Sequence, residues 1–351
     1  MRLRAVPLPD GDEPVEWTIA DGRVHARRGP ADAPELPGGW VVPGLVDAHA
    51  HLTFEARDRL GLPRGSDELV AAHLALHRRA GVLAVRDAGS LPGVVLRAER
   101  AAGGVRVVGC GPFLAPPDFF HEHLYEGTPA DRAVAAARDR VRAGWPWVKV
   151  ISDFPGPDRN PLAPRLGYPL ELMRQIAAAV HAEGGRLAAH VMGRIVGEVV
   201  DAGADSIEHG NWADERAVRA MAARGTAWCP TLTTVLHHLE PIAERVPPAR
   251  ELLALQREML PLAAELGLTL LAGTDEEPHG SVAAEVAALV RYGVPAATAI
   301  AAASTGARAF LGLPGLEDGA PADLVVFDRD PREDVAALAA PVAVLTAGAP
   351  A

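Results

Sequence analysis

Lys149 is the only lysine among the 34 lysine and arginine residues of this 351-residue chain. It lies inside the apolar stretch 147–154, where a charged amine is costly unless another charge compensates it. At such a position a lysine can do one thing that an arginine cannot, because only lysine loses its proton readily. Its deprotonated amine can react with carbon dioxide to give a carbamate, whose two oxygens can bridge two metal ions. Pairing with a buried carboxylate is the alternative interpretation, and Lys149 alone does not decide between them.

Potential metal ligands end several other apolar stretches of the chain. They are His49, His51, His190, His209 and Asp275. Alternation along a strand places His49 and His51 on the same face, although such a pair can also be structural. Imidazoles and carboxylates are ligands that zinc, manganese and iron accept. Together with Lys149, these side chains predict a metal centre. Asp47 and Glu208 face away from the ligands and are predicted to support them.

The elements that would position these residues are short apolar strands alternating with alanine-rich helices. Strands are expected at 45–51, 82–88, 105–109, 147–152, 186–191, 204–209, 227–231 and 269–273. Helices are expected at 66–80, 130–143, 169–183, 214–223, 248–265 and 282–292, the second with Thr128 as N-cap and Pro129 in first position. Eight such units predict an α/β fold of the TIM (β/α)8 barrel type, with the active site at the C-terminal ends of the strands. A doubly wound sheet is the alternative, but no glycine-rich phosphate motif follows the first strand.

The two ends of the chain have a different pattern, of short strands and turns. Asp21-Gly22 predicts a hairpin within residues 1–42, and residues 313–351 contain two further strands. We therefore expect three segments: one half of a β-sandwich at 1–42, the barrel at 43–312 and the other half of the sandwich at 313–351. The two end segments would form this small composite β-sandwich beside the barrel.

Composition excludes several functional classes. The net charge of −11 argues against nucleic acid or an anionic membrane as a partner, and no stretch approaches the ~18 apolar residues of a membrane span. Two cysteines make no disulfide framework, and the N-terminus lacks the apolar run of a signal peptide. These features predict a cytoplasmic protein with a small-molecule substrate, and they leave open whether it forms a homo-oligomer.

Four segments of the chain resemble the amidohydrolase superfamily, and within it the imidazolonepropionase/prolidase-like (Xaa-Pro dipeptidase-like) branch. They are residues 42–51, 206–210, 272–275 and 319–326, the last followed by Asp330-Pro331. The resemblance spans nearly the whole chain and implies the barrel and the composite sandwich. It also implies that His49, His51 and Asp275 hold the more buried of two divalent metal ions. His190 and His209 would then hold the other, with carboxylated Lys149 as the bridge.

This resemblance predicts a binuclear metal-dependent amidohydrolase with zinc, or else manganese or iron. A water activated between the metals would attack a carbonyl, and Asp275 would act as general base and then as general acid toward the leaving amine. The expected substrate is a dipeptide (Xaa-Pro-like), an N-acyl amino acid or a cyclic amide, while lactone hydrolysis stays open. One alternative is a mononuclear deaminase or imidazolonepropionase-type enzyme with unmodified Lys149. Another is a non-catalytic metal-binding barrel.

Substrate contacts are harder to predict than metal ligands. His123, Tyr168 and Arg194 follow predicted strands and are candidates, as is Arg159 for a substrate carboxylate, while Glu276 and Glu277 would make the mouth of the site acidic. The remaining histidines are expected to be structural or exposed. We expect His73, His77 and His181 on helix surfaces, and His237, His238 and His279 in exposed loops near the mouth.

Overall fold

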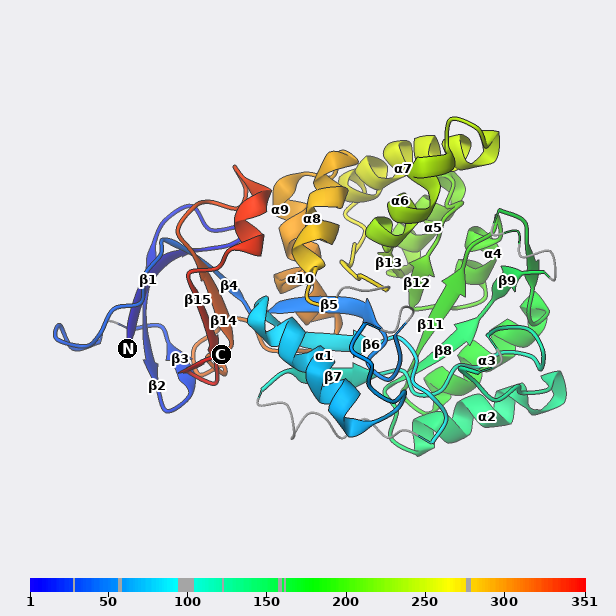
Figure 1. Ribbon diagram of the computed structural model, residues 1–351, viewed down its shortest axis with the longest axis horizontal. Helices are drawn as coiled ribbons and strands as arrows, with labels where there is room; N and C mark the ends of the chain where they lie inside the picture. The colour runs from blue at the N-terminus through cyan, green and yellow to red at the C-terminus, as the bar shows by residue number, and fades with distance from the viewer. Residues whose placement is uncertain are drawn as a thin grey trace.

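The computed structural model describes residues 1–27, 29–55, 59–93, 104–121, 123–156, 160, 162–275 and 279–351. Its chain forms a small sheet that contains both termini and a larger region in which helices cover parallel strands (Figure 1). None of the described helices is long and apolar enough to cross a membrane.

The small sheet joins the two ends of the chain. Its order is β16-β15-β14-β4-β1-β2-β3, and β14 from the C-terminal end pairs antiparallel with β4 from the N-terminal end. The predicted hairpin at Asp21-Gly22 is confirmed, because both residues have the positive φ that such a turn requires, 52° and 74°. The strands are β1 (Arg2–Pro7), β2 (Val15–Ala20), β3 (Arg23–His25), β4 (Trp40–Pro43), β14 (Leu324–Phe327), β15 (Ala343–Thr346) and β16 (Ala349–Pro350).

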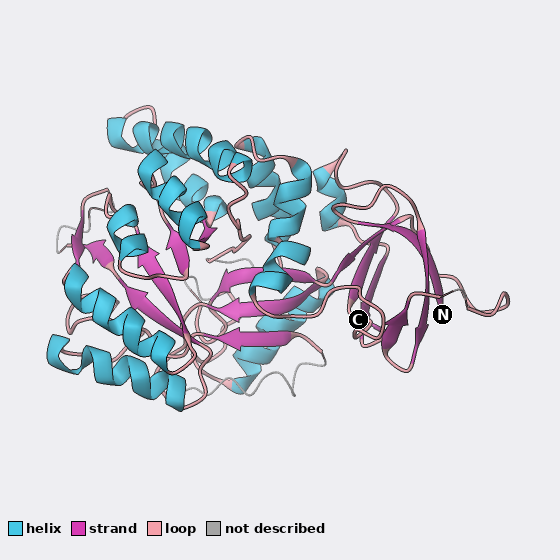
Figure 2. Ribbon diagram, turned by 180° about the vertical axis from the view of Figure 1, so that it is seen from behind, coloured by secondary structure: helices cyan, strands magenta, loops and turns pink. Residues whose placement is uncertain are grey.

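The larger region contains two parallel sheets, with helices along the outer side of their strands (Figure 2). One sheet has the order β5-β6-β7 and the other β13-β12-β11-β8, while β9 and β10 form a separate pair. Seven of the eight predicted strands are present. They are β5 (Leu45–Ala50), β6 (Val82–Asp87), β7 (Arg106–Gly109), β8 (Trp147–Ile151), β11 (Arg186–Val191), β12 (Ser206–His209) and β13 (Ala227–Cys229). The strands β9 (Asp153–Pro155) and β10 (Pro164–Leu166) were not predicted.

The prediction of one continuous eight-stranded barrel differs from this arrangement. The expected eighth strand at 269–273 is not assigned as a strand, and this region makes only isolated bridges, from Leu270 to Trp228 and from Asp275 to Ala50. Local geometry explains why the segment 269–273 pairs with its neighbours only at isolated residues. Asp275 has φ of 58°, which ends extended pairing, and a Cβ at Gly273 would lie 2.5 Å from both Cys229 Sγ and His49 Cβ. The structure therefore shows an α/β fold with fragmented parallel sheets.

The six predicted helices begin and end close to the predicted positions. They are α1 (Asp67–Arg79), α2 (Ala130–Arg142), α3 (Leu170–Ala182), α5 (Glu215–Arg224), α7 (Pro247–Glu265) and α8 (Val282–Arg291). The shorter helices α4 (Val196–Asp201), α6 (Leu232–Leu239), α9 (Ala296–Ala302) and α10 (Thr305–Phe310) were not predicted. The short 3-10 helices are η1 (Glu240–Ile242) and η2 (Val335–Ala339). The predicted cap of α2 is wrong, because Pro129 and not Thr128 is the N-cap and it makes no side-chain cap hydrogen bond. Thr128 instead accepts a hydrogen bond from Tyr168 through its carbonyl.

Candidate metal centre

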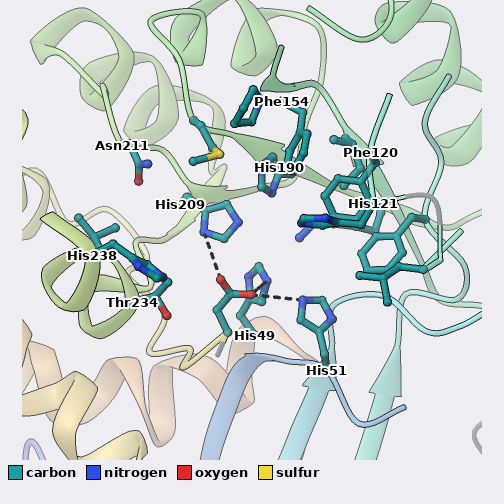
Figure 3. A pocket seen from close by; sticks show the side chains of 18 of the residues that line it. His49, His51, Phe120, His121, Phe154, His190, His209, Asn211, Thr234 and His238 are labelled. Atoms are coloured by element: carbon teal, nitrogen blue, oxygen red, sulfur yellow. Dashed lines mark ion pairs between the residues drawn. The ribbon is translucent and has the colours of Figure 1, made fainter. Parts of the chain in front are cut away.

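The six predicted ligands meet at one cavity of about 810 Å³. His49 and His51 lie at the end of β5, Lys149 lies inside β8, His190 and His209 lie at the ends of β11 and β12, and Asp275 follows the segment 269–273. Figure 3 shows His49, His51, His190 and His209 directed toward a common point. Parallel strands bring their C-terminal ends to one edge, so residues far apart in sequence converge there. All six line the cavity: His49, His51, Lys149, His190, His209 and Asp275.

His49, His51 and Asp275 form the tightest group. Asp275 Oδ1 lies 3.3 Å from His49 Nε2 and 3.2 Å from His51 Nε2. The Asp275 amide donates a 2.6 Å hydrogen bond to the His49 carbonyl, which holds the two backbones together. One ligand atom from each of the three residues lies within 4.8 Å of the others, an arrangement that can hold a metal ion.

His190 and His209 form a second group next to the first. Their ring centroids are 4.4 Å apart, and His209 lies 5.0 Å from the His49 ring. His209 Nδ1 is hydrogen-bonded to Thr231 Oγ1 at 2.8 Å. Nε2 of both His49 and His190 is buried without a hydrogen-bond partner, and a buried nitrogen left unpaired is costly. Two such nitrogens facing a cavity beside a carboxylate fit a metal site well.

Backbone strain concentrates at the same place. His209, Thr231 and Asp275 have φ of 67°, 46° and 58°, a region that residues other than glycine rarely adopt. Each such residue costs on the order of 1–3 kcal/mol unless its surroundings hold it, and strain of this kind gathers at functional sites. The three residues contact one another through His209, whose Nδ1 is hydrogen-bonded to Thr231 and lies 4.0 Å from the Asp275 carboxylate.

Glu208 contacts His49 at Nδ1, on the side of the ring away from Asp275, as the sequence predicted. Its carboxylate accepts hydrogen bonds from His49 Nδ1 at 2.7 Å and from Arg86 Nη2 at 2.7 and 2.8 Å. Burial opposes the charge of Glu208, but Arg86 and His49 outweigh it and hold the pKa of this carboxyl well below its usual range. A carboxylate that accepts from Nδ1–H leaves Nε2 of His49 bare and available as a ligand. Asp47 accepts hydrogen bonds from the His49 amide and from Thr274, so it holds the backbone next to His49 and Asp275.

Arg86 was not singled out from the sequence. It is fully buried, and its guanidinium also donates to the Ala48 carbonyl at 2.6 Å. Cys229 lies near Glu208 and His49, but burial raises the pKa of its thiol well above the usual value, so it stays protonated. Arg86 and Glu208 therefore form a buried ion pair next to His49, one of the candidate ligands.

Lys149 is buried with 1% of its surface exposed. Burial lowers the pKa of its amine, although nearby Glu208 favours the charged form. Among the described residues none forms a direct ion pair with Lys149, so the alternative of a salt-bridged lysine finds no support in this geometry. A lowered pKa increases the fraction of neutral amine, the form that reacts with carbon dioxide.

The predicted substrate contacts have different outcomes. His123 lines the cavity. Tyr168 lies outside the cavity lining, because its side chain is buried and its hydroxyl donates to the Thr128 carbonyl at 2.6 Å. Arg194 also lies outside it, stacked 3.7 Å over Trp212 and paired with Glu251 at 2.9 Å. Arg159, Glu276 and Glu277 lie outside the described residues.

Several histidine predictions are wrong. His73 and His77 are completely buried rather than exposed on α1, and His279 is buried and lines the cavity. His181 is exposed as expected, with 43% of its side chain accessible. His237 and His238 are exposed but belong to α6 rather than to a loop, and His238 lines the cavity.

The rest of the cavity wall is largely apolar. One side carries aromatic rings, including Phe54, Phe113, Phe120 and Phe154, and Figure 3 shows Phe120 and Phe154 close to His190. The other side carries aliphatic side chains of α6, η1 and α7: Val235, Leu239, Ile242 and Leu252. The polar ligands therefore lie in a mostly apolar cavity, as in many small-molecule sites.

Comparisons with known proteins identify relatives over the whole chain. Residues 40–348 match the model of the Amidohydrolase family. An uncharacterized protein of Mycobacterium tuberculosis is 32% identical over 360 residues, which cover 99% of this chain and 95% of that protein. Ochratoxinase of Aspergillus niger is 28% identical over 222 residues, 60% of this chain and 46% of the fungal protein. The crystal structure of a Xaa-Pro dipeptidase with bound methionine superimposes with a TM-score of 0.80 at 22% identity, covering 100% of this chain and 99% of the other. At that identity the structural match shows a shared fold.

Proposed function

Because the chain belongs to the amidohydrolase family and is therefore a hydrolase of carbon–nitrogen bonds, we propose that it is a binuclear, metal-dependent amidohydrolase of the prolidase-like type. One divalent ion would be held by His49, His51 and Asp275. The other would be held by His190 and His209, with carboxylated Lys149 between the two. The observation that carries this proposal is the pair of bare, buried nitrogens, Nε2 of His49 and of His190, in one cavity with a buried lysine.

We also propose that the two parallel sheets form one (β/α)8 barrel at 43–312. The isolated bridges support this, because Leu270 and Asp275 connect β13 to β5 and Leu114 connects to Val150 of β8. Segments 1–42 and 313–351 would then make a composite β-sandwich as a separate domain. Its own apolar core, with residues such as Leu3, Trp17 and Leu324, supports that division.

When bound, two divalent ions would supply a Lewis acid for the substrate carbonyl and a water that is acidic enough to attack near neutral pH. Asp275 is the base that receives the proton of the attacking water. Burial opposes its charge, but His49 and the other surrounding histidines hold the pKa of this carboxyl well below its usual value, so it is ionised. The water adds to the carbonyl carbon, the carbon–nitrogen bond breaks, and Asp275 returns the proton to the leaving amine. Glu208 keeps His49 in the tautomer that this arrangement needs.

The substrate is proposed to be a dipeptide such as Xaa-Pro, an N-acyl amino acid or a cyclic amide. A cavity of about 810 Å³ holds any of these with room for a large side group. The aromatic and aliphatic walls favour apolar groups on both sides of the scissile bond, and His123 lies where it can contact one of them.

The proposal is tested by measuring the metal content of the protein and its turnover of three candidate substrates. The panel is Ala-Pro, N-acetyl-L-methionine and dihydrouracil, assayed with protein purified without chelators. We expect about two equivalents of metal and hydrolysis of at least one panel member. Lys149→Ala should lose the second equivalent, and Lys149→Arg should behave alike because a guanidinium cannot form the carbamate. One equivalent in the wild type, with Lys149→Ala unaffected, would favour the mononuclear enzyme, and bound metal without turnover would favour a binding protein.

A further inference from the structure

Three buried histidines that the proposed mechanism does not use form a cluster beside the cavity, and one of them lines its wall. His73 and His77 come from α1, and His279 lines the cavity. The His279 ring lies 3.8 Å from the His73 ring, and His279 Nδ1 is 3.0 Å from His77 Nε2. His73 contacts the carbonyl of Leu52, the residue after His51, so the cluster connects α1 with the segment that follows β5, here called the α1 side of the cavity.

A backbone amide determines where the protons of this cluster lie. The Gly280 N–H points at His77 Nδ1 at 3.2 Å, and an amide can only donate. His77 Nδ1 must therefore be bare, so the neutral ring carries its proton on Nε2. That proton is donated to His279 Nδ1. His279 Nδ1 is in turn an acceptor, and the neutral His279 ring carries its proton on Nε2.

The cluster is held rigidly. Gly280 has φ of 86°, and a Cβ there would lie 2.9 Å from the Leu76 carbonyl, so only glycine allows this close approach to α1. His73 Nδ1 donates to the Leu52 carbonyl at 3.1 Å, which holds its ring against His279, tilted by 32°. Burial also lowers the pKa of His77 to about 3 and that of His279 well below its usual value, so both rings are neutral near pH 7.

We propose that His279 is a specificity-determining residue whose Nε2–H donates a hydrogen bond to an oxygen of the amide substrate. The inference rests on the proposed function, whose site shares the same cavity. His279 is not a base or a metal ligand, because its Nδ1 is occupied by His77 and its Nε2 carries the proton. It is an uncharged donor that selects substrates with a carbonyl or carboxylate oxygen on the α1 side of the cavity. His77 is a positioning residue that holds this donor in place.

The tautomers can be measured without any turnover. In protein labelled with ¹⁵N at histidine, two-bond ¹H–¹⁵N correlations distinguish a protonated from a bare ring nitrogen, and His77→Gln and His279→Gln assign the two signals. We expect protonated Nε2 and bare Nδ1 for both His77 and His279 at pH 7. A protonated Nδ1 in His279, or a doubly protonated ring, would overturn the proposal whatever the enzyme hydrolyses.

Kinetics then test the role toward substrate, with the panel member that the wild-type enzyme hydrolyses fastest. His279→Phe keeps an aromatic ring against His73 but removes the donor. KM should therefore rise about tenfold, as expected for about 1.4 kcal/mol, while kcat changes little. His279→Gln retains an N–H near the same place and should restore most of the affinity. His181→Phe, on the exposed face of α3, is the matched control and should leave KM unchanged.

The two proposals fail in different ways. An unchanged KM in His279→Phe, with normal turnover and two bound metals, would refute the donor role and leave the proposed function intact. A drop in kcat alone would also refute it. A wild-type protein that hydrolyses no panel member would refute the proposed function, and the kinetic role of His279 with it, even where the tautomers are as inferred.

Discussion

Glu208→Gln replaces one carboxylate oxygen by an amide nitrogen in the buried pair next to His49, one of the proposed metal ligands. Glu208 and Arg86 are both completely buried, with two contacts of 2.7 and 2.8 Å between them. The glutamine keeps the shape and one acceptor oxygen, but it leaves the Arg86 charge uncompensated. Its side chain can present either the amide oxygen or the amide NH2 group to His49 Nδ1. The tautomer of His49 is therefore no longer fixed by a group that can only accept a hydrogen bond.

Two magnitudes follow from this geometry. Removing one partner of a buried ion pair costs about 3–5 kcal/mol of unfolding free energy, and the retained acceptor favours the lower end. Loss of the carboxylate behind a metal-binding histidine weakens metal binding about 10–100-fold. The pKa of Glu208 is lower when folded than in the unfolded chain, so the pair contributes its stability above about pH 4.3 and loses it as the pH falls further.

Urea unfolding of metal-free protein measures the first effect, because bound metal would add its own stabilisation. Glu171→Gln is the matched control, since Glu171 forms an exposed pair with Arg174 and should change the stability by less than about 0.5 kcal/mol. Adding Arg86→Met to Glu208→Gln should recover some of the loss, because no unpaired charge then remains. Unfolding of Glu208→Gln at the same urea concentration as Glu171→Gln would refute the reasoning.

Three further changes test other regions of the site. Lys149→Ala should reduce turnover by more than about 100-fold, a larger effect than the roughly 10–100-fold expected when a residue that supports a ligand is removed. A small added carboxylate such as formate should restore some turnover in the same assay. Asp275→Asn should keep much of the metal in elemental analysis yet lower kcat about 10²–10⁴-fold, and unchanged turnover would exclude it from proton transfer. Glu285 is buried under α6 and accepts hydrogen bonds from the amides of Leu232 and Thr233, and burial raises its pKa to about 7. Its folded pKa lies above the unfolded value of about 4.3, so stability should fall by about 3 kcal/mol as the pH rises from 4.3 to 7, and Glu285→Gln should lack this slope in urea titrations.

The convergence of the six candidate ligands on one cavity could be predicted because most of them lie at or just after the end of an apolar strand. Strand periodicity and the common direction of parallel strands are enough to bring His49, His190 and His209 together. The same reasoning located seven strands of the larger region but missed how weakly the eighth segment pairs. That weakness comes from the close approach of Gly273 and the positive φ of Asp275, which depend on neighbours and not on local pattern.

Arg86 and the histidine cluster were missed for a different reason. A polar side chain is expected on the surface unless a buried partner satisfies it, and the partner of Arg86 lies 122 residues away while that of His77 lies 202 residues away. For α1, however, a signal was present. Leu69, Val70 and Leu74 set an apolar stripe along the helix, and His73 and His77 continue it at the same spacing. A histidine inside an apolar stripe should be assigned to the interior, and its partner should then be sought among the polar residues that follow the strand ends.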